Sequence, residues 1–123
     1  MSTTTTPKLK TSAMIASFAD PGQKTAPAPF GHALAALADR DERIVGLSAD
    51  LAKYTDMHIF RDRHPERFFQ MGMAEQLLFG AAAGMAEVGL VPFASTYSVF
   101  AARRAYDFIC LDIAEPHLNV NVV

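Results

Sequence analysis

Hydrophobic positions along the chain fall into a repeat of helix and strand patterns from residue 30 onward. Segment 30–38 has apolar residues at helical spacing, which predicts an amphipathic helix that ends at the charged residues 39–42. The run 43–48 is typical of a buried strand. Segment 53–65 then predicts a short helix that ends at Pro65. The apolar face expected for the first helix consists of Phe30, Ala33, Leu34, Leu37 and Ala38.

The repeat continues with a second strand and a strongly apolar helix. Segment 67–71 has the length and composition of a strand, and Gly72 allows a tight turn after it. A helix is expected to begin at residues 74–76 and to continue through residue 86. Because this helix is apolar on nearly every face, we expect it to be buried all round, in a core or against another subunit.

A fourth helix and two more strands complete the pattern. Segment 91–96 predicts a strand, with Pro92 near its start, where a missing ladder donor is tolerated. A helix is expected over 101–114, followed by a strand pattern over 117–123 with no turn after it. We therefore expect an α/β fold, a parallel sheet covered by helices on both faces and truncated at its C-terminal end.

Composition adds limits to this picture. The 123 residues suffice for one domain; half are hydrophobic and a fifth are charged, as in ordinary soluble α/β proteins. The net charge of −2 offers no basic surface for nucleic acid. No run resembles a membrane span or a targeting peptide, so we expect a cytoplasmic protein. Residues 1–29 are expected to form a mobile N-terminal arm, and residues 30–123 the domain.

Cysteine and histidine suggest no metal site. A single cysteine, Cys110, excludes an internal disulfide and a multi-cysteine zinc site, and its apolar helical context predicts a buried packing residue rather than a reactive thiol. His58 and His64 lie near aspartates, but their spacing matches no strong metal motif. We expect these two histidines, and His32 on the first helix, to be surface residues.

Chemistry-bearing side chains follow three of the predicted strands. Asp50 comes directly after the first strand, Glu75 lies in the first turn of the apolar helix, and Tyr97 and Phe100 follow the third strand. Ligands bind at the carboxyl ends of strands in open α/β sheets, so these residues predict a pocket for a planar, nitrogen-containing ring. Two simpler interpretations remain open: Glu75 also suits a helix macrodipole, and aromatic pairs three residues apart often lie in a core.

Three ordered motifs resemble the pyrimidine-binding domain of the transketolase family, over about residues 30–123. They are Ser48-Ala49-Asp50-Leu51, Met71-Gly72-Met73-Ala74-Glu75-Gln76 and Phe93-Ala94-Ser95-Thr96-Tyr97-Ser98-Val99-Phe100, the last followed by Arg104-Ala105-Tyr106-Asp107. The resemblance implies the thiamine-diphosphate-binding fold and a thiamine-diphosphate-dependent enzyme of the transferase type.

The resemblance also implies roles for individual residues. The family glutamate that matches Glu75 is catalytic: it hydrogen-bonds ring nitrogen N1′ of the cofactor and promotes the imino tautomer, which activates the thiazolium C2 for attack on a ketose carbonyl. Tyr97 and Phe100 match aromatic residues that pack around the pyrimidine, and Asp50 matches an aspartate on the cofactor side. Arg103 falls at another ring-packing position.

Some positions depart from the family pattern. Arg104 competes with Arg103 for the ring-packing assignment, because it begins the Arg-Ala-Tyr-Asp motif. The arginine that holds a substrate phosphate in transketolases has no counterpart in Ala26-Pro27-Ala28-Pro29, and Tyr54 replaces a second phosphate ligand, a serine. The substrate therefore stays open.

The diphosphate-binding domain, with its metal-binding Gly-Asp-Gly signature, has no counterpart in these 123 residues. The resemblance is therefore to the small subunit of a split transketolase, in which a partner subunit binds the diphosphate and magnesium. Gly80 and Gly84 on the apolar helix suit a close helix contact at such an interface, or simple core packing.

Three functions follow as hypotheses. The first is a subunit of a homo- or hetero-oligomer that transfers a two-carbon ketol unit. The second is a 1-deoxyxylulose-5-phosphate synthase or a 2-oxoacid dehydrogenase beta-type subunit. The third is a non-catalytic assembly module.

Overall fold

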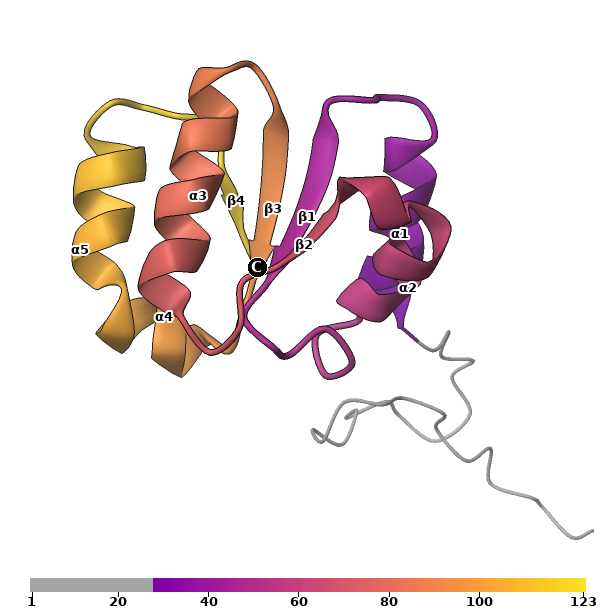
Figure 1. The fold of residues 1–123 in the computed structure, drawn as a ribbon, viewed down its shortest axis with the longest axis horizontal. Coiled ribbons are helices and arrows are strands. Elements are labelled where there is room, and N and C mark those ends of the chain that lie inside the picture. Colours follow the sequence, from indigo (N-terminus) through magenta and orange to yellow (C-terminus); the bar gives the residue numbers. More distant parts are fainter. Residues whose placement is uncertain (1–27) are drawn as a thin grey trace, which may run out of the picture.

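The computed structural model describes residues 28–123 and contains one sheet of four parallel strands within that range (Figure 1). The sheet order is β2-β1-β3-β4. Residues 1–27 of the predicted arm lie outside the described residues, and Pro29 begins the first helix. The strands are β1 (Ile44–Ser48), β2 (Phe68–Gln70), β3 (Val91–Ser95) and β4 (Asn121–Val122).

Helices cover both faces of this sheet, as Figure 1 shows, so the predicted fold class is confirmed. One face carries α1 (Pro29–Ala38), α2 (Met57–Arg63) and the 3₁₀ turn η1 (Pro65–Arg67). The other face carries α3 (Glu75–Glu87), α4 (Ser98–Arg104), α5 (Tyr106–Phe108) and the π-helical segment η2 (Ile109–Ala114).

The central strand β1 divides the core between the two layers. Val45 and Leu47 pack into the cluster that includes α3, whereas Ile44 packs against α1 and α2. Gly46 lies on the α2 side, where an added Cβ would meet the Phe60 ring at 2.8 Å. The period of two along a strand explains this alternation, and it makes β1 buried at every residue.

Pro92 occupies the second position of β3 without losing a ladder bond. The N–H of Val91 donates to the carbonyl oxygen of Arg43, just before β1. Because successive residues of a strand direct their backbone groups to opposite neighbours, those of Pro92 face β4. Pairing with β4 begins only at Phe93, and the carbonyl of Pro92 accepts a hydrogen bond from the Asn121 side chain at 3.3 Å. The missing donor therefore lies where no ladder partner is needed.

The buried face of α1 differs from the predicted face. Leu37 is 47% exposed, and Phe30 is half-buried. The helix is rotated because Gly31 faces α2, where a Cβ would lie 2.2 Å from the carbonyl oxygen of Asp56. Hydrophobicity alone could not identify glycine as the contact residue. The buried residues of α1 are Gly31, Leu34, Ala35 and Ala38.

Two predicted elements are shorter than expected, and a third is interrupted. The helix predicted over 53–65 is reduced to α2, because Asp56 adopts a left-handed conformation with φ of 63°. The helix predicted over 101–114 is interrupted at Ala105, with φ of −128° and ψ of 15°. The strand predicted over 117–123 contracts to β4, with His117 at φ of 57°.

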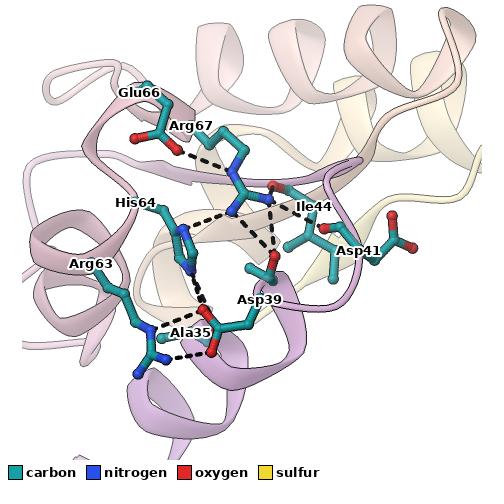
Figure 2. A network of polar contacts seen from close by, with 9 residues as sticks. Ala35, Asp39, Asp41, Ile44, Arg63, His64, Glu66 and Arg67 are labelled. Carbon is teal, nitrogen blue, oxygen red and sulfur yellow. Dashed lines mark hydrogen bonds and ion pairs between the residues drawn. The ribbon is translucent and has the colours of Figure 1, made fainter.

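A polar network joins the α1 layer to η1 (Figure 2). The guanidinium of Arg67 donates hydrogen bonds to backbone carbonyl oxygens of three residues and, at 2.6 Å, to Nδ1 of His64. Arginine has no acceptor, so this ring nitrogen must accept. The three carbonyls belong to Ala38, Asp41 and Ile44.

The other ring nitrogen of His64 completes the network. Its Nε2 lies 3.2 Å from both the carbonyl oxygen of Ala35 and Oδ1 of Asp39, and Asp39 also pairs with Arg63. The predicted surface position of His64 is therefore wrong, because the ring is buried among fixed partners. His58 is half-buried, and His32 is exposed as predicted.

Candidate active site

Parallel pairing puts the carboxyl ends of β1, β2 and β3 at one edge of the sheet. The side chain of Gln70, the last residue of β2, joins two of the loops there. Its Oε1 accepts from the N–H of Asp50 at 2.7 Å and from that of Gly72 at 3.2 Å. Gln70 is not among the predicted site residues; the available signal was a polar residue between an apolar run and a turn glycine.

Glu75 begins α3 immediately after this edge. Gly72, with φ of 71°, makes the turn, and the N–H of Ala74 donates to the Gly72 carbonyl at 2.8 Å. The predicted strand-to-helix junction is confirmed. Glu75 is only 4% exposed, which is uncommon for a carboxylate and requires a partner.

That partner is Arg104 at the end of α4. Its Nη1 lies 3.2 Å from Oε1 and 3.4 Å from Oε2 of Glu75. The centre of the same guanidinium lies 4.0 Å from the centroid of the Phe100 ring, and the Tyr97 ring stacks with Phe100 at 5.9 Å between centroids. These four side chains form one cluster, called the Glu75 cluster below.

A hollow of about 420 Å³ adjoins the Glu75 cluster. Both Arg103 and Arg104, the two candidates for the predicted ring-packing position, line this hollow. Their contacts distinguish them. Arg104 contacts Glu75 and Phe100, whereas Arg103 contributes to the wall. The lining residues are Met73, Ala74, Glu75, Gln76, Arg103 and Arg104.

Asp50 lies apart from the Glu75 cluster. Its side chain is exposed, its φ is 61°, and its N–H donates to Gln70. These features place it with the β1 and β2 loops, whereas Glu75 contacts α4. The structure therefore brings Glu75, Tyr97 and Phe100 together and leaves Asp50 at the neighbouring part of the same edge.

Two polar groups at the end of β3 add to the polar character of this edge. The hydroxyl oxygens of Ser95 and Thr96 are buried and have no hydrogen-bond partner among the described residues. Buried hydroxyls normally have a partner, and these two directly precede Tyr97 in the chain.

Helix α3 is buried on one face rather than all round. Leu78, Phe79 and Ala82 are fully buried, whereas Leu77 is 56% exposed and Gly84 is exposed. Cys110 in η2 is half-buried, not fully buried as predicted. A second hollow of about 520 Å³ lies between α3 and η2. Its lining residues are Gly80, Ala83, Gly84, Glu87, Leu111, Asp112, Glu115 and Pro116.

Residues 28–123 contain neither a cluster of metal-binding side chains nor a helix suited to cross a membrane. This part of the chain contains no cluster of three or more histidine, cysteine or acidic residues that could hold a metal ion. It also contains no helix long and apolar enough to cross a membrane.

Comparisons with known proteins connect this geometry to a family. The family model described as "Transketolase, pyrimidine binding domain" matches residues 24–123. A transketolase family protein of Sinorhizobium fredii is 70% identical over 117 residues, which cover 95% of this chain and 34% of that protein. The chain thus spans about a third of the length of this relative.

Two further relatives are informative. A protein of Methanocaldococcus jannaschii named as a transketolase C-terminal section is 44% identical over 76% of this chain and 30% of its own length. The 1-deoxy-D-xylulose-5-phosphate synthase of Desulfitobacterium hafniense is 41% identical over 74% of this chain and 14% of that enzyme.

A solved structure agrees with these relatives. The chain called "Split gene transketolase, inactive beta4 tetramer" superposes with a TM-score of 0.70 and 49% sequence identity, over 77% of this chain and 31% of that chain. Because a family model matches most of the sequence, the chain belongs to the transketolase family, and the match is to its pyrimidine-binding domain.

Proposed function

We propose that this chain supplies the pyrimidine-binding half of a thiamine diphosphate site in an enzyme that transfers a two-carbon ketol unit from a ketose. The observation that carries the proposal is the buried carboxylate of Glu75 at the start of α3, in one cluster with the Tyr97 and Phe100 rings. Family membership supports the cofactor.

The residues present fit the ring of this cofactor. An aminopyrimidine is planar, so it suits the face of an aromatic pair, and its ring nitrogen suits a carboxylate partner. Both features occur in the Glu75 cluster, beside a hollow of about 420 Å³. The unpartnered hydroxyls of Ser95 and Thr96 lie at the same strand end.

Each residue then has a definite role. Glu75 holds a proton shared with ring nitrogen N1′, and its burial excludes water that would compete for that proton. Tyr97 and Phe100 orient the ring by packing, Arg103 contributes to the wall, and Asp50 lies on the cofactor side near the subunit boundary. When bound, the cofactor supplies the carbanion chemistry and acts as the electron sink.

The proposed site is completed by a second subunit. Relatives that are named as a transketolase C-terminal section and as a split gene transketolase support this arrangement. We propose that the partner binds the diphosphate and magnesium. The open face of α3, with Gly80 and Gly84 beside the second hollow, is the proposed contact surface.

A second candidate is the reaction of 1-deoxyxylulose-5-phosphate synthase, which the 41% identity to such an enzyme favours. A 2-oxoacid dehydrogenase beta-type role is a further alternative that needs the same glutamate. Assays of the assembled enzyme with ketose donors and with pyruvate would separate these reactions, because the ketol-transfer proposal expects turnover with a ketose donor.

The central test is Glu75→Gln in the complex reconstituted with its diphosphate-binding subunit. Loss of the proton-sharing carboxylate should lower kcat by at least about 100-fold, in the range of general acid–base contributions. The matched control is Glu42→Gln, the same change on an exposed residue before β1, which should leave kcat within about twofold. An unchanged kcat for Glu75→Gln would reject the catalytic proposal and favour a non-catalytic assembly module.

A further inference from the structure

Arg104 contacts the two groups that the proposed function assigns to the cofactor ring. Its Nη1 reaches both carboxylate oxygens of Glu75, at 3.2 and 3.4 Å. The same guanidinium covers the Phe100 ring, with its central carbon 4.0 Å from the ring centroid. One side chain therefore engages the carboxylate and the aromatic face at once.

The chemistry of a guanidinium explains why it suits both contacts. The group is flat and delocalised, carries N–H donors for a carboxylate, and stacks on aromatic faces. An aminopyrimidine ring that shares a proton with a carboxylate has the same combination of a flat face and an N–H donor. Arg104 and such a ring therefore satisfy Glu75 and Phe100 in the same way.

We propose that Arg104 is an internal competitor of the aminopyrimidine ring, which must displace its guanidinium from Glu75 and Phe100 to bind. This proposal rests on the proposed function and adds a regulatory residue to the site. By pairing with Glu75, Arg104 satisfies a carboxylate that burial would otherwise leave without a partner.

Two observations show that this displacement is feasible. The side chain of Arg104 is 47% exposed, so water can solvate the guanidinium when it leaves Glu75. It is also the last residue of α4, directly before the helix interruption at Ala105. Only the Arg104 side of the ion pair is half-exposed, and a charge that water already reaches gains little from pairing. A ring that makes better contacts with Glu75 can therefore replace the guanidinium.

The test measures binding of thiamine diphosphate with magnesium to the reconstituted complex by calorimetry. Arg104→Met keeps the length of the side chain and removes its charge and its donors. We expect the Kd of this variant to fall roughly fivefold, the gain expected when this ion pair no longer competes. Arg61→Met is the matched control, because Arg61 on α2 is 48% exposed, pairs with Asp62 and does not line the hollow; it should change Kd by less than about twofold.

A second measurement tests the contact without any ligand chemistry. In the chain alone, the Nη–H signals of Arg104 in a ¹⁵N spectrum should be shifted from those of free arginine, because Nη1 donates to Glu75. Glu75→Gln should move them toward the free values. Arg104→Gln provides a smaller polar variant if Arg104→Met does not fold, and the same decrease in Kd is expected.

The possible failures are distinguishable. If Glu75→Gln weakens cofactor binding but Arg104→Met leaves Kd unchanged or raises it, Arg104 supports the ring and the competition is overturned while the proposed function stands. If Glu75→Gln binds the cofactor as tightly as the wild-type protein, the proposed function fails and its premise for Arg104 fails with it.

Discussion

The molecule contains two arginine-centred clusters that differ in what surrounds them. In the first, Arg67 donates to three backbone carbonyls and to His64, and only 17% of its side chain is exposed (Figure 2). In the second, Arg104 is 47% exposed and contacts a buried Glu75 beside a hollow. The backbone acceptors of the first cluster cannot leave, whereas the side chains of the second can rearrange. The first cluster therefore stabilises the fold, and the second is suited to binding.

Glycines show the same contrast between the two layers. On the α1 and α2 side, Gly31 and Gly46 have no room for a Cβ, because helix and strand approach closely there. On the α3 side, Gly84 has no atom within 4 Å of an added Cβ. One layer is packed within the chain, and the other presents an open helix face.

The largest effect is expected at Arg67. Arg67→Met removes the side-chain donor to three carbonyls and to His64, and should lower the free energy of unfolding by about 3 kcal/mol. Urea unfolding measures this. Arg61→Met is the control, because Arg61 pairs with Asp62 on the surface and its loss should cost less than about 1 kcal/mol. Equal effects of the two changes would show that the network does not stabilise the fold.

The next effect contrasts two glycine-to-alanine changes. Gly31→Ala drives a Cβ to within 2.2 Å of the Asp56 carbonyl, and the overpacking should cost about 2 kcal/mol or more. Gly84→Ala meets no atom and lies in a helix, so it should stabilise the isolated chain by about 0.5–1 kcal/mol.

Thermal unfolding of both variants provides the measurement. If Gly84 contacts a partner subunit, Gly84→Ala should also weaken assembly by gel filtration or calorimetry, although it stabilises the chain. A stabilised variant that assembles normally would remove α3 around Gly84 from the proposed interface.

The smallest effect concerns the rim of the Arg67 network. Side-chain and backbone hydrogen bonds with Arg43 lower the pKa of Asp41 from 3.8 to about 2. A carboxyl group whose pKa is lower in the folded state stabilises the protein at pH values above its pKa in the unfolded chain. This contribution is lost as the pH falls through the folded-state pKa. Asp41→Asn should therefore lose less stability than the wild-type protein between about pH 4 and pH 2.

Unfolding at a series of pH values measures this difference, and an Arg43→Gln background serves as the control. Without its partner, the Asp41 substitution should have almost no pH-dependent effect. Parallel stability curves for Asp41→Asn and the wild-type protein between pH 4 and pH 2 would contradict the expectation.

Local patterns predicted much of the fold and the centre of the site. The apolar run of β1, the alternation of helices and strands, and the junction before Glu75 depend on neighbouring residues, so they are readable from the sequence. Tyr97 and Phe100 could be paired because residues three apart in a helix face the same way. Residue spacing also placed Arg103 and Arg104 near each other, but could not decide between them.

Contacts between distant residues could not be predicted in this way. Gln70 joins the loops after β1 and β2, His64 is enclosed by α1 and η1, and Arg104 reaches Glu75 across 29 positions of sequence. Each depends on how layers pack, and a polar side chain carries no local signal of which distant acceptor it will meet.

The sequence alone determined the order of elements, the sheet type and the position of Glu75 at a strand exit, because these follow from hydrophobic period and turn residues. Tertiary structure alone decided that α3 keeps an open face, that α1 turns Gly31 toward α2, and that Arg104 contacts both Glu75 and Phe100. The physical reason is that burial and pairing are properties of two surfaces in contact, and one stretch of sequence specifies only its own surface.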